Sequence, residues 1–174
     1  MRALQWLAQR EHSRAELRGK LLRLLQRNSR DVRNTGEPGD DRPDAAADGS
    51  AHSVPAVEVD AVLDWLQQNG HLSDARFTET RVHARQARFG NRRIQQELQQ
   101  HGVALDLAAR QALQQSELAR ATEVWRRKYG APAEDAAGRV RQLRFMLGRG
   151  FSMDVVRRVV QGSTDTAEGT GCDA

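Results

Sequence analysis

The chain has 174 residues, of which 39% are apolar, 29% are charged and only 5% are aromatic. This length fits one domain, and so few aromatic and β-branched residues do not favour a β-sheet protein. No run of about 18 apolar residues is present, so we expect no membrane-spanning helix. The start of the chain turns polar too soon for a secretory signal, and the only cysteine, Cys172, excludes an internal disulfide. We therefore expect a cytoplasmic protein.

The basic residues are concentrated outside two acidic segments. Residues 28–56 hold six acidic side chains against three arginines, and residues 162–174 hold three acidic side chains and no basic one. The rest of the chain has 24 basic and 14 acidic residues, although the net charge of the whole is only +4. Such a basic body favours a polyanionic partner, with nucleic acid as the first choice. The alternative is a well-solvated surface encoded by an arginine-favouring genome.

The same two segments are predicted to be flexible. Residues 28–56 contain three of the four prolines and almost no large apolar side chain. Ordering them would bury too little apolar surface to offset the lost backbone entropy. We interpret 28–56 as a flexible acidic insertion and 162–174 as a disordered tail.

The first part of the chain shows apolar residues at helical spacing. Leu4 and Leu7 share one face before a break at Glu11, and Ser13 then starts a second helix. Glu16 follows Ser13 by three positions, which is the pattern of a capping box. After the insertion, a helix closed by Gly70 is predicted from the stripe Val59, Val62, Leu63 and Leu66.

The second part continues in the same way. Ser73 is predicted to cap a helix that reaches about Arg88, and a helix over 90–101 follows. Asp106 is predicted to cap a helical region that ends at Gly130. Two further helices are expected over 136–149 and from Ser152 onward. No segment of comparable length alternates with a period of two, so the predicted fold class is all-α.

Three of these helix starts can be superimposed on one another. Four residues after Ser13, Gly90 and Ser152 lie Leu17, Ile94 and Val156, and eight residues after them lie Leu21, Leu98 and Val160. A helix, a tight turn and a second helix recur each time. Because one helical pair cannot bury its own apolar face, we expect tandem three-helix units stacked into an elongated, curved body. The alternative is an irregular helical bundle.

The predicted units divide the chain as follows. Repeat one is formed by 1–27 and closed by 57–72, with the insertion 28–56 between them. Repeat two occupies 73–130 and includes long closing helices. Repeat three occupies 131–161, and the tail follows.

No catalytic constellation is recognisable. The five histidines are scattered, and neither a metal-ligand spacing nor a phosphate-binding glycine loop is present. We therefore expect no catalytic, metal-binding or cofactor-binding residue, and no enzyme. The aromatic residues fall on or beside apolar stripes, which indicates that they are mostly core residues and argues against a base-stacking platform. They are Trp6, Trp65, Phe77, Trp125 and Phe145.

The residues that suggest a function are basic side chains on helix faces. Arg81, Arg85 and Arg88 lie at i, i+4 and i+7, on one stripe of a helix. Corresponding positions in stacked units would form a basic track suited to phosphates or to an acidic groove. The alternative is that many arginines pair with Glu79, Glu97 or Glu123. The predicted track comprises Arg14, Arg18, Arg81, Arg85, Arg88, Arg92, Arg93, Arg126, Arg127, Lys128, Arg141, Arg144, Arg149, Arg157 and Arg158.

The run from Val62 to Val103, VLDWLQQNGHLSDARFTETRVHARQARFGNRRIQQELQQHGV, resembles the central motif of the RecX family of RecA regulators. Two flanking pieces are similar as well: REHSRAELRGKL near the amino terminus and LGRGFSMDVVRRVV near the carboxyl terminus. This sequence departs from the family pattern in three places: the insertion is longer than the usual connection, Thr78 stands where a smaller residue is usual, and Phe89 precedes Gly90. The motif residues are Trp65, Leu66, Gly70, Leu72, Asp74, Phe77, Gly90, Ile94, Leu98, Gly102, Gly150 and Phe151.

The resemblance implies an all-helical protein of tandem three-helix repeats that binds along the groove of a RecA–DNA filament. It implies inhibition of ATP hydrolysis, strand exchange and coprotease function, and so a role in recombinational repair and the SOS response. It also implies binding to single- or double-stranded DNA, and we expect a monomer. A helix-turn-helix transcription regulator is the alternative. A helical scaffold for protein partners, whose binding would not depend on salt, is a third possibility.

Overall fold

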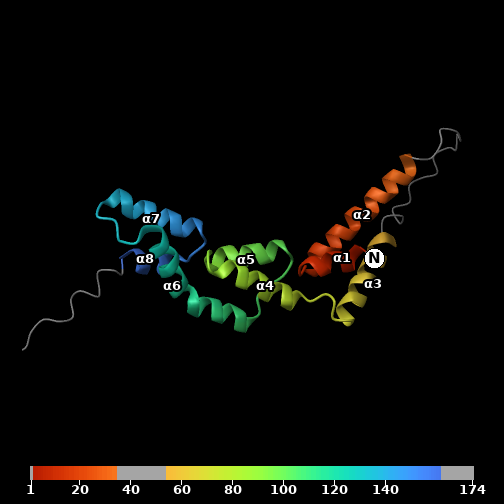
Figure 1. The fold of residues 1–174 in the computed structure, drawn as a ribbon, viewed down its shortest axis with the longest axis horizontal. Helices are drawn as coiled ribbons and strands as arrows, with labels where there is room; N and C mark the ends of the chain where they lie inside the picture. Colours follow the sequence, from red (N-terminus) through yellow and green to blue (C-terminus); the bar gives the residue numbers. More distant parts are fainter. Residues whose placement is uncertain (1, 35–53, 162–174) are drawn as a thin grey trace, which may run out of the picture. The chain divides into compact units, whose positions relative to one another are not determined.

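The computed structural model describes residues 2–34 and 54–161, and every regular element in these residues is an α-helix (Figure 1). The fold class is therefore all-α, as predicted. The eight helices are α1 (Arg2–Gln9), α2 (Arg14–Asn34), α3 (Val54–Gln68), α4 (Asp74–Gln86), α5 (Asn91–Gln100), α6 (Leu107–Tyr129), α7 (Ala136–Gly148) and α8 (Met153–Gln161).

The predicted caps start the helices where the sequence indicates. The Ser13 hydroxyl accepts a hydrogen bond from the Glu16 amide at 3.1 Å, and the Ser73 hydroxyl accepts one from the Arg76 amide at 3.3 Å. The Asp106 carboxylate accepts a hydrogen bond from the Ala109 amide at 2.7 Å. Each acceptor satisfies an amide that has no partner inside its helix, which fixes the first turn.

Helix α2 extends further than the sequence pattern indicated. It continues through Asn34, seven residues into the segment interpreted as a flexible insertion. No glycine or proline occurs between Asn28 and Gly36, so nothing in the local sequence stops the helix earlier. The remainder of the predicted insertion up to residue 53, and the predicted tail 162–174, lie outside the described residues.

Trp65 was predicted to be a core residue, and this prediction is wrong. Its side chain is 48% exposed, and Val62 on the same helix is 46% exposed. The buried stripe of α3 consists of Val59, Leu63 and Leu66 at i, i+4 and i+7. Trp65 precedes Leu66 by one position and therefore lies about 100° around the helix from it.

The chain divides into two compact units, residues 1–77 and 78–174, each with its own core. In the first unit, α2 packs against α3, and the cluster of buried residues is Ala3, Leu17, Val59, Leu63, Leu66 and Leu72. In the second unit, α6, α7 and α8 pack against one another, and α5 packs on α6. The cluster there is Ala121, Val124, Trp125, Met146, Phe151, Val156, Val159 and Val160.

Candidate nucleic-acid interface

In the second unit, two turns between helices pack directly against each other. The turn between α4 and α5 contains Gly90, whose amide donates to the Arg149 carbonyl at 2.9 Å. Arg149 begins the turn between α7 and α8, and the Arg92 amide donates to the Gly150 carbonyl of this turn at 3.1 Å. The two turns are therefore joined by backbone hydrogen bonds, in the manner of adjacent strands.

This close approach requires glycine at both positions. A Cβ atom at Gly90 would lie 2.2 Å from the Phe151 nitrogen and 2.3 Å from the Gly150 oxygen, which are main-chain atoms that cannot rotate away. Gly150 has a φ of +84°, a conformation that other residues rarely adopt. Both glycines belong to the predicted motif, and their packing explains why that motif needs them.

Helix α6 holds the two turns together through one buried carboxylate. Glu117, only 5% exposed, accepts hydrogen bonds from the Asn91 amide at 3.1 Å and the Ser152 amide at 3.3 Å. Its other oxygen accepts one from the Ser152 hydroxyl at 3.1 Å. Because these groups begin α5 and α8, the negative charge of Glu117 lies at the positive ends of both helices.

Arg120, one turn along α6 from Glu117, fixes the first of these turns. Its guanidinium donates to the Phe89 carbonyl at 3.0 Å and to the Gln86 carbonyl at 3.2 Å. Burial lowers the pKa of Arg120 from its usual value. An arginine that donates to several carbonyls remains charged, so Arg120 is a structural cation at the base of this site.

The packed turns gather arginines around two phenylalanine rings. The guanidinium of Arg93 lies 4.8 Å from the centre of the Phe89 ring, and those of Arg85 and Arg149 lie 5.7 and 5.8 Å from it. Arg149 also lies 4.7 Å from the centre of the Phe145 ring. Guanidinium groups at such distances are attracted to the ring face, so the rings hold several cations close together without neutralising them.

Beside these rings is a hollow of about 240 Å³, which we call the basic hollow. Its lining residues are Ala87, Arg88, Val124, Arg127, Lys128, Phe145 and Arg149. Arg127 is paired with Glu123 at 2.7 Å, whereas neither Arg88 nor Lys128 has an ion pair among the described residues. Four cations around a small concave surface make an electropositive site that can accept a phosphate or carboxylate group.

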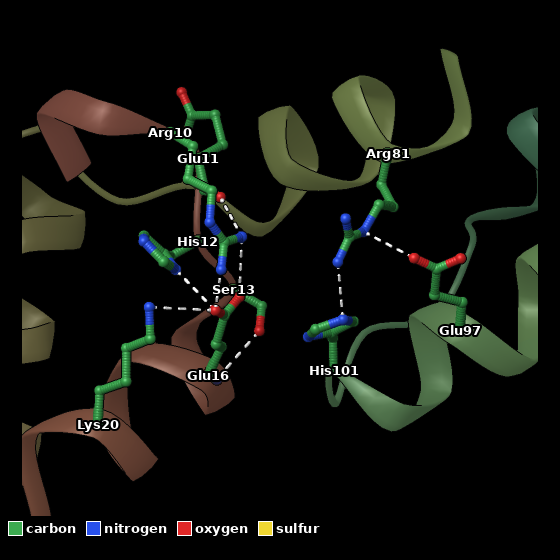
Figure 2. A network of polar contacts seen from close by, with 9 residues as sticks. All are labelled: Arg10, Glu11, His12, Ser13, Glu16, Lys20, Arg81, Glu97 and His101. Atoms are coloured by element: carbon green, nitrogen blue, oxygen red, sulfur yellow. Dashed lines mark hydrogen bonds and ion pairs between the residues drawn. The ribbon is translucent and has the colours of Figure 1, made fainter. Parts of the chain in front are cut away.

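Other members of the predicted track are neutralised. In the second unit, Glu97 of α5 pairs with Arg81 at 3.2 Å and with Arg85 at 3.0 Å. Figure 2 shows the Arg81 guanidinium between Glu97 and His101, whose Nε2 lies 2.9 Å from Arg81. Helix α4 ends at Gln86, so Arg88 of the predicted stripe lies in the turn after the helix. Arg88 retains an exposed charge with no acidic partner in the described residues.

The two track residues predicted in the first unit are also paired. Arg14 lies 2.7 Å from Asp64, and Arg18 lies 2.7 Å from Asp60, so both join α2 to α3. The hydrogen bond from Arg18 is the main cause that lowers the pKa of Asp60. These arginines contact acidic neighbours on α3 in the first unit.

The remaining track residues are exposed cations without an ion pair in the described part of the chain. They lie at the ends of α5 and α6 and on α7 and α8, and comprise Arg92, Arg126, Arg141, Arg144, Arg157 and Arg158. All are in the second unit. The sequence prediction therefore identified a set of side chains of which only part is available to a partner.

A separate polar network in the first unit ties the connection between α1 and α2 to the first turns of α2. Figure 2 shows Glu16 receiving contacts from Arg10, His12 and Lys20, with His12 Nδ1 at 3.0 Å and Lys20 Nζ at 3.4 Å from Glu16 Oε1. Burial lowers the pKa of His12 from 6.5. Burial also acts to raise the pKa of Glu16, but the hydrogen bond from Arg10 and the neighbouring charges outweigh it and hold that pKa below 4.5.

Three contributors to the site were missed by sequence reasoning: Phe89, Glu117 and Arg120. Phe89 was noted only as a departure from the family pattern, and the two α6 residues look like ordinary helix-surface charges. A signal for Glu117 was present, because it lies four residues after Leu113 and four before Ala121 on the buried stripe of α6. A carboxylate on a buried stripe indicates partners from other elements.

The described residues offer neither a membrane-spanning helix nor a metal-binding cluster. No helix there is sufficiently long and apolar to cross a membrane. No group of three or more histidine, cysteine, aspartate or glutamate side chains there could hold a metal ion.

The fold and the site define a class of protein: an all-helical protein that presents basic side chains from tandem short helical units. Comparison with family models identifies the units. Residues 73–113 match the model described as "RecX, second three-helix domain", and residues 115–160 match "RecX, third three-helix domain". The two matched domains meet inside α6, so this one helix closes the second three-helix domain and opens the third.

Relatives support the same assignment over most of the chain. "Regulatory protein RecX" of Ralstonia nicotianae is 41% identical, with 93% of this chain and 86% of the relative covered. The protein of the same name from Leptothrix cholodnii is 43% identical, with 92% and 85% covered, and that from Pseudomonas entomophila is 35% identical, with 92% and 88% covered. The chain belongs to the RecX family, as its motif predicted, and its relatives are named regulatory proteins.

Proposed function

We propose that this protein is a non-catalytic cytoplasmic regulator that binds the RecA–DNA filament and inhibits ATP hydrolysis, strand exchange and coprotease function. Its role would be to modulate recombinational repair and the SOS response. Membership of the RecX family supports the regulatory part of this proposal. The basic hollow, with four cations and the Phe145 ring in the second unit, is the observation that supports binding to a nucleoprotein polyanion.

The basic hollow is suited to this partner because its cations are already positioned. Arg149 is fixed by two rings and donates to the Arg88 carbonyl at 3.1 Å, so it loses little conformational freedom on binding. Arg88 and Lys128 supply unpaired charge at the rim. A protein that binds an inactive arrangement of the filament more tightly than the active one shifts the equilibrium between them by that difference in affinity, and no catalytic step is needed.

The experiment is a titration of this protein into RecA, single-stranded DNA and ATP, with the rate of ATP hydrolysis as the readout. The test variant is Arg88→Gln with Lys128→Gln. The control is Arg110→Gln with Arg139→Gln, which removes the same charge from exposed positions outside the basic hollow. Arg85 is left unchanged because it pairs with Glu97.

We expect the test variant to need at least about tenfold more protein for half-inhibition, because a hydrogen bond to a charged group contributes about 1.5–3 kcal/mol. The control variant should inhibit like the unaltered protein. Equal inhibition by the two variants would contradict the assignment of the basic hollow as the contact surface.

The helix-turn-helix transcription regulator is retained as a second candidate because of one observation. The pairs α4–α5 and α7–α8 are each joined by a tight turn, and their second helices carry exposed Arg92 and Arg157. A recognition helix in a major groove needs such residues. A sequence-selective footprint on duplex DNA, with no effect on RecA, would favour this function.

The domain organisation belongs to the same proposal. Residues 1–27 and 57–72 would form the first repeat, with 28–56 inserted between them, and the later helices would form the second and third. The sequence places the boundary between the second and third repeats at residue 130, whereas the matched family domains meet between residues 113 and 115. We also propose that the protein acts as a monomer and that it contacts single- or double-stranded DNA.

A further inference from the structure

A second basic surface lies in the first unit, and it involves none of the residues of the predicted track. It is a hollow of about 310 Å³ between α1 and α2, which we call the N-terminal hollow. Its lining residues are Arg2, Trp6, Lys20, Arg23, Leu24 and Arg27. Arg2 and Trp6 are four positions apart on α1, and the other four lie at i, i+3, i+4 and i+7 on α2. Helical spacing therefore brings every one of them to a single concave face.

The cations of this hollow are largely free of acidic partners. Arg2, Arg23 and Arg27 have no ion pair among the described residues, and Lys20 is 3.4 Å from Glu16, which it shares with Arg10 and His12. The same helix pairs Arg14 and Arg18 with acids of α3 on its other side. Acidic residues thus neutralise one face of α2 and leave the face at the N-terminal hollow strongly positive.

The cations are also held in place by neighbouring groups. The Arg23 Nε donates to the Gly19 carbonyl at 2.9 Å, and Lys20 Nζ lies 5.5 Å from the centre of the Trp6 ring. Trp6 packs partly against the core of the unit while it lines the hollow. An apolar floor of Trp6 and Leu24 below a cationic rim is the combination that binds single-stranded nucleic acid, with phosphates on the cations and a base or sugar on the aromatic ring.

We propose that the N-terminal hollow is a binding site for single-stranded nucleic acid. Its phosphodiester groups contact Arg2, Arg23 and Arg27, and an unpaired base or its sugar contacts Trp6. An acidic protein surface would satisfy the cations but would have no use for the aromatic floor. Duplex DNA could reach the cations, but its bases are stacked on one another and are not free to contact Trp6.

The test is binding of the full chain to a short oligothymidylate without RecA, measured over a range of salt concentrations. Arg2→Gln with Arg27→Gln should weaken binding. It should also make the slope of log K against log salt shallower by about 1.4, since each phosphate contact to a single strand contributes about 0.7. Arg110→Gln with Arg139→Gln is the control, because it removes the same charge from exposed positions of the second unit, outside the hollow. Circular dichroism should give the same helix content for all variants.

Trp6 supplies a second readout. Oligothymidylate should change the tryptophan emission of the unaltered protein, whereas a duplex of equal charge should not, and Trp6→Phe should abolish the change. The proposal is overturned if Arg110→Gln with Arg139→Gln weakens binding as much as Arg2→Gln with Arg27→Gln, or if Trp6 does not respond. It is also overturned if polyglutamate competes as well as DNA, which would indicate a protein partner. Because RecA is absent, this result is independent of the inhibition assay above.

Discussion

Gly90→Ala should destabilise the second unit strongly, although it adds a single methyl group. The new Cβ would lie 2.2 Å from the Phe151 nitrogen and 2.3 Å from the Gly150 oxygen, whereas unstrained contacts are about 3.5–4.0 Å. The turns must separate by more than about 1 Å to accept it. That movement breaks the two backbone hydrogen bonds between Gly90 and Arg149 and between Arg92 and Gly150.

The magnitude follows from these losses. Each hydrogen bond contributes about 1 kcal/mol. Overpacking adds about 1–3 kcal/mol, and here the obstructing atoms are main-chain atoms that cannot choose another rotamer. We therefore expect a decrease of about 3–5 kcal/mol in the free energy of unfolding, which is a large part of the stability of an ordinary domain.

Urea unfolding measures this change, with Trp125 as the probe because it is 5% exposed in the core of the second unit. Trp6→Phe and Trp65→Phe in all samples leave Trp125 as the only indole. Gly148→Ala is the matched control: nothing lies within 4 Å of a Cβ there, and alanine should stabilise the end of α7 by about 0.5–1 kcal/mol. If Gly90→Ala unfolds at the same urea concentration as the control, the close packing of the two turns is not real.

Three other predictions concern single side chains. Glu117→Gln should lower the stability of the second unit by about 2 kcal/mol in the same urea experiment, because the caps of α5 and α8 lose their charge; an unchanged midpoint would contradict this. The pKa of His12 is lower in the folded protein than in the unfolded chain, so the unfolded chain binds more protons just below pH 6.5. The first unit should therefore lose stability as the pH falls from 6.5 towards the folded pKa. His12→Gln should make the free energy of unfolding less dependent on pH in this range. Leu66→Ala should lower the free energy of unfolding by about 2–5 kcal/mol, because Leu66 is buried. Trp65→Ala should lower it less despite the larger side chain, because Trp65 is half exposed. In thermal unfolding, Leu66→Ala should therefore have the lower melting temperature of the two.

The helices could be predicted from the sequence because their signals are local. Ser13, Ser73 and Asp106 accept hydrogen bonds from amides three residues later, and this contact depends on nothing outside the first turn. The exposure of Trp65 could not be predicted from local signals of this kind. Val62 and Trp65 lie beside an apolar stripe, and only the position of the neighbouring helices decides how wide a strip of α3 is covered.

The candidate interface was predicted only as a collection of cations. The composition shows that basic side chains outnumber acidic ones, but it does not show which arginines form ion pairs with acidic side chains. Arg14 and Arg18 are paired because Asp60 and Asp64 are on α3, 42 or more residues away in sequence, whereas Arg2 and Arg27 have no such neighbour. The role of Phe89 likewise depends on Arg149, which reaches it from another helix pair.

The central claim is that the unpaired cations of the basic hollow bind the RecA–DNA filament. The inhibition titration with RecA, single-stranded DNA and ATP tests it most directly, using Arg88→Gln with Lys128→Gln against Arg110→Gln with Arg139→Gln. We predict that the first pair raises the half-inhibitory concentration by about tenfold or more and that the second leaves it unchanged. Unchanged inhibition by the first pair, with its helix content intact, would contradict the claim.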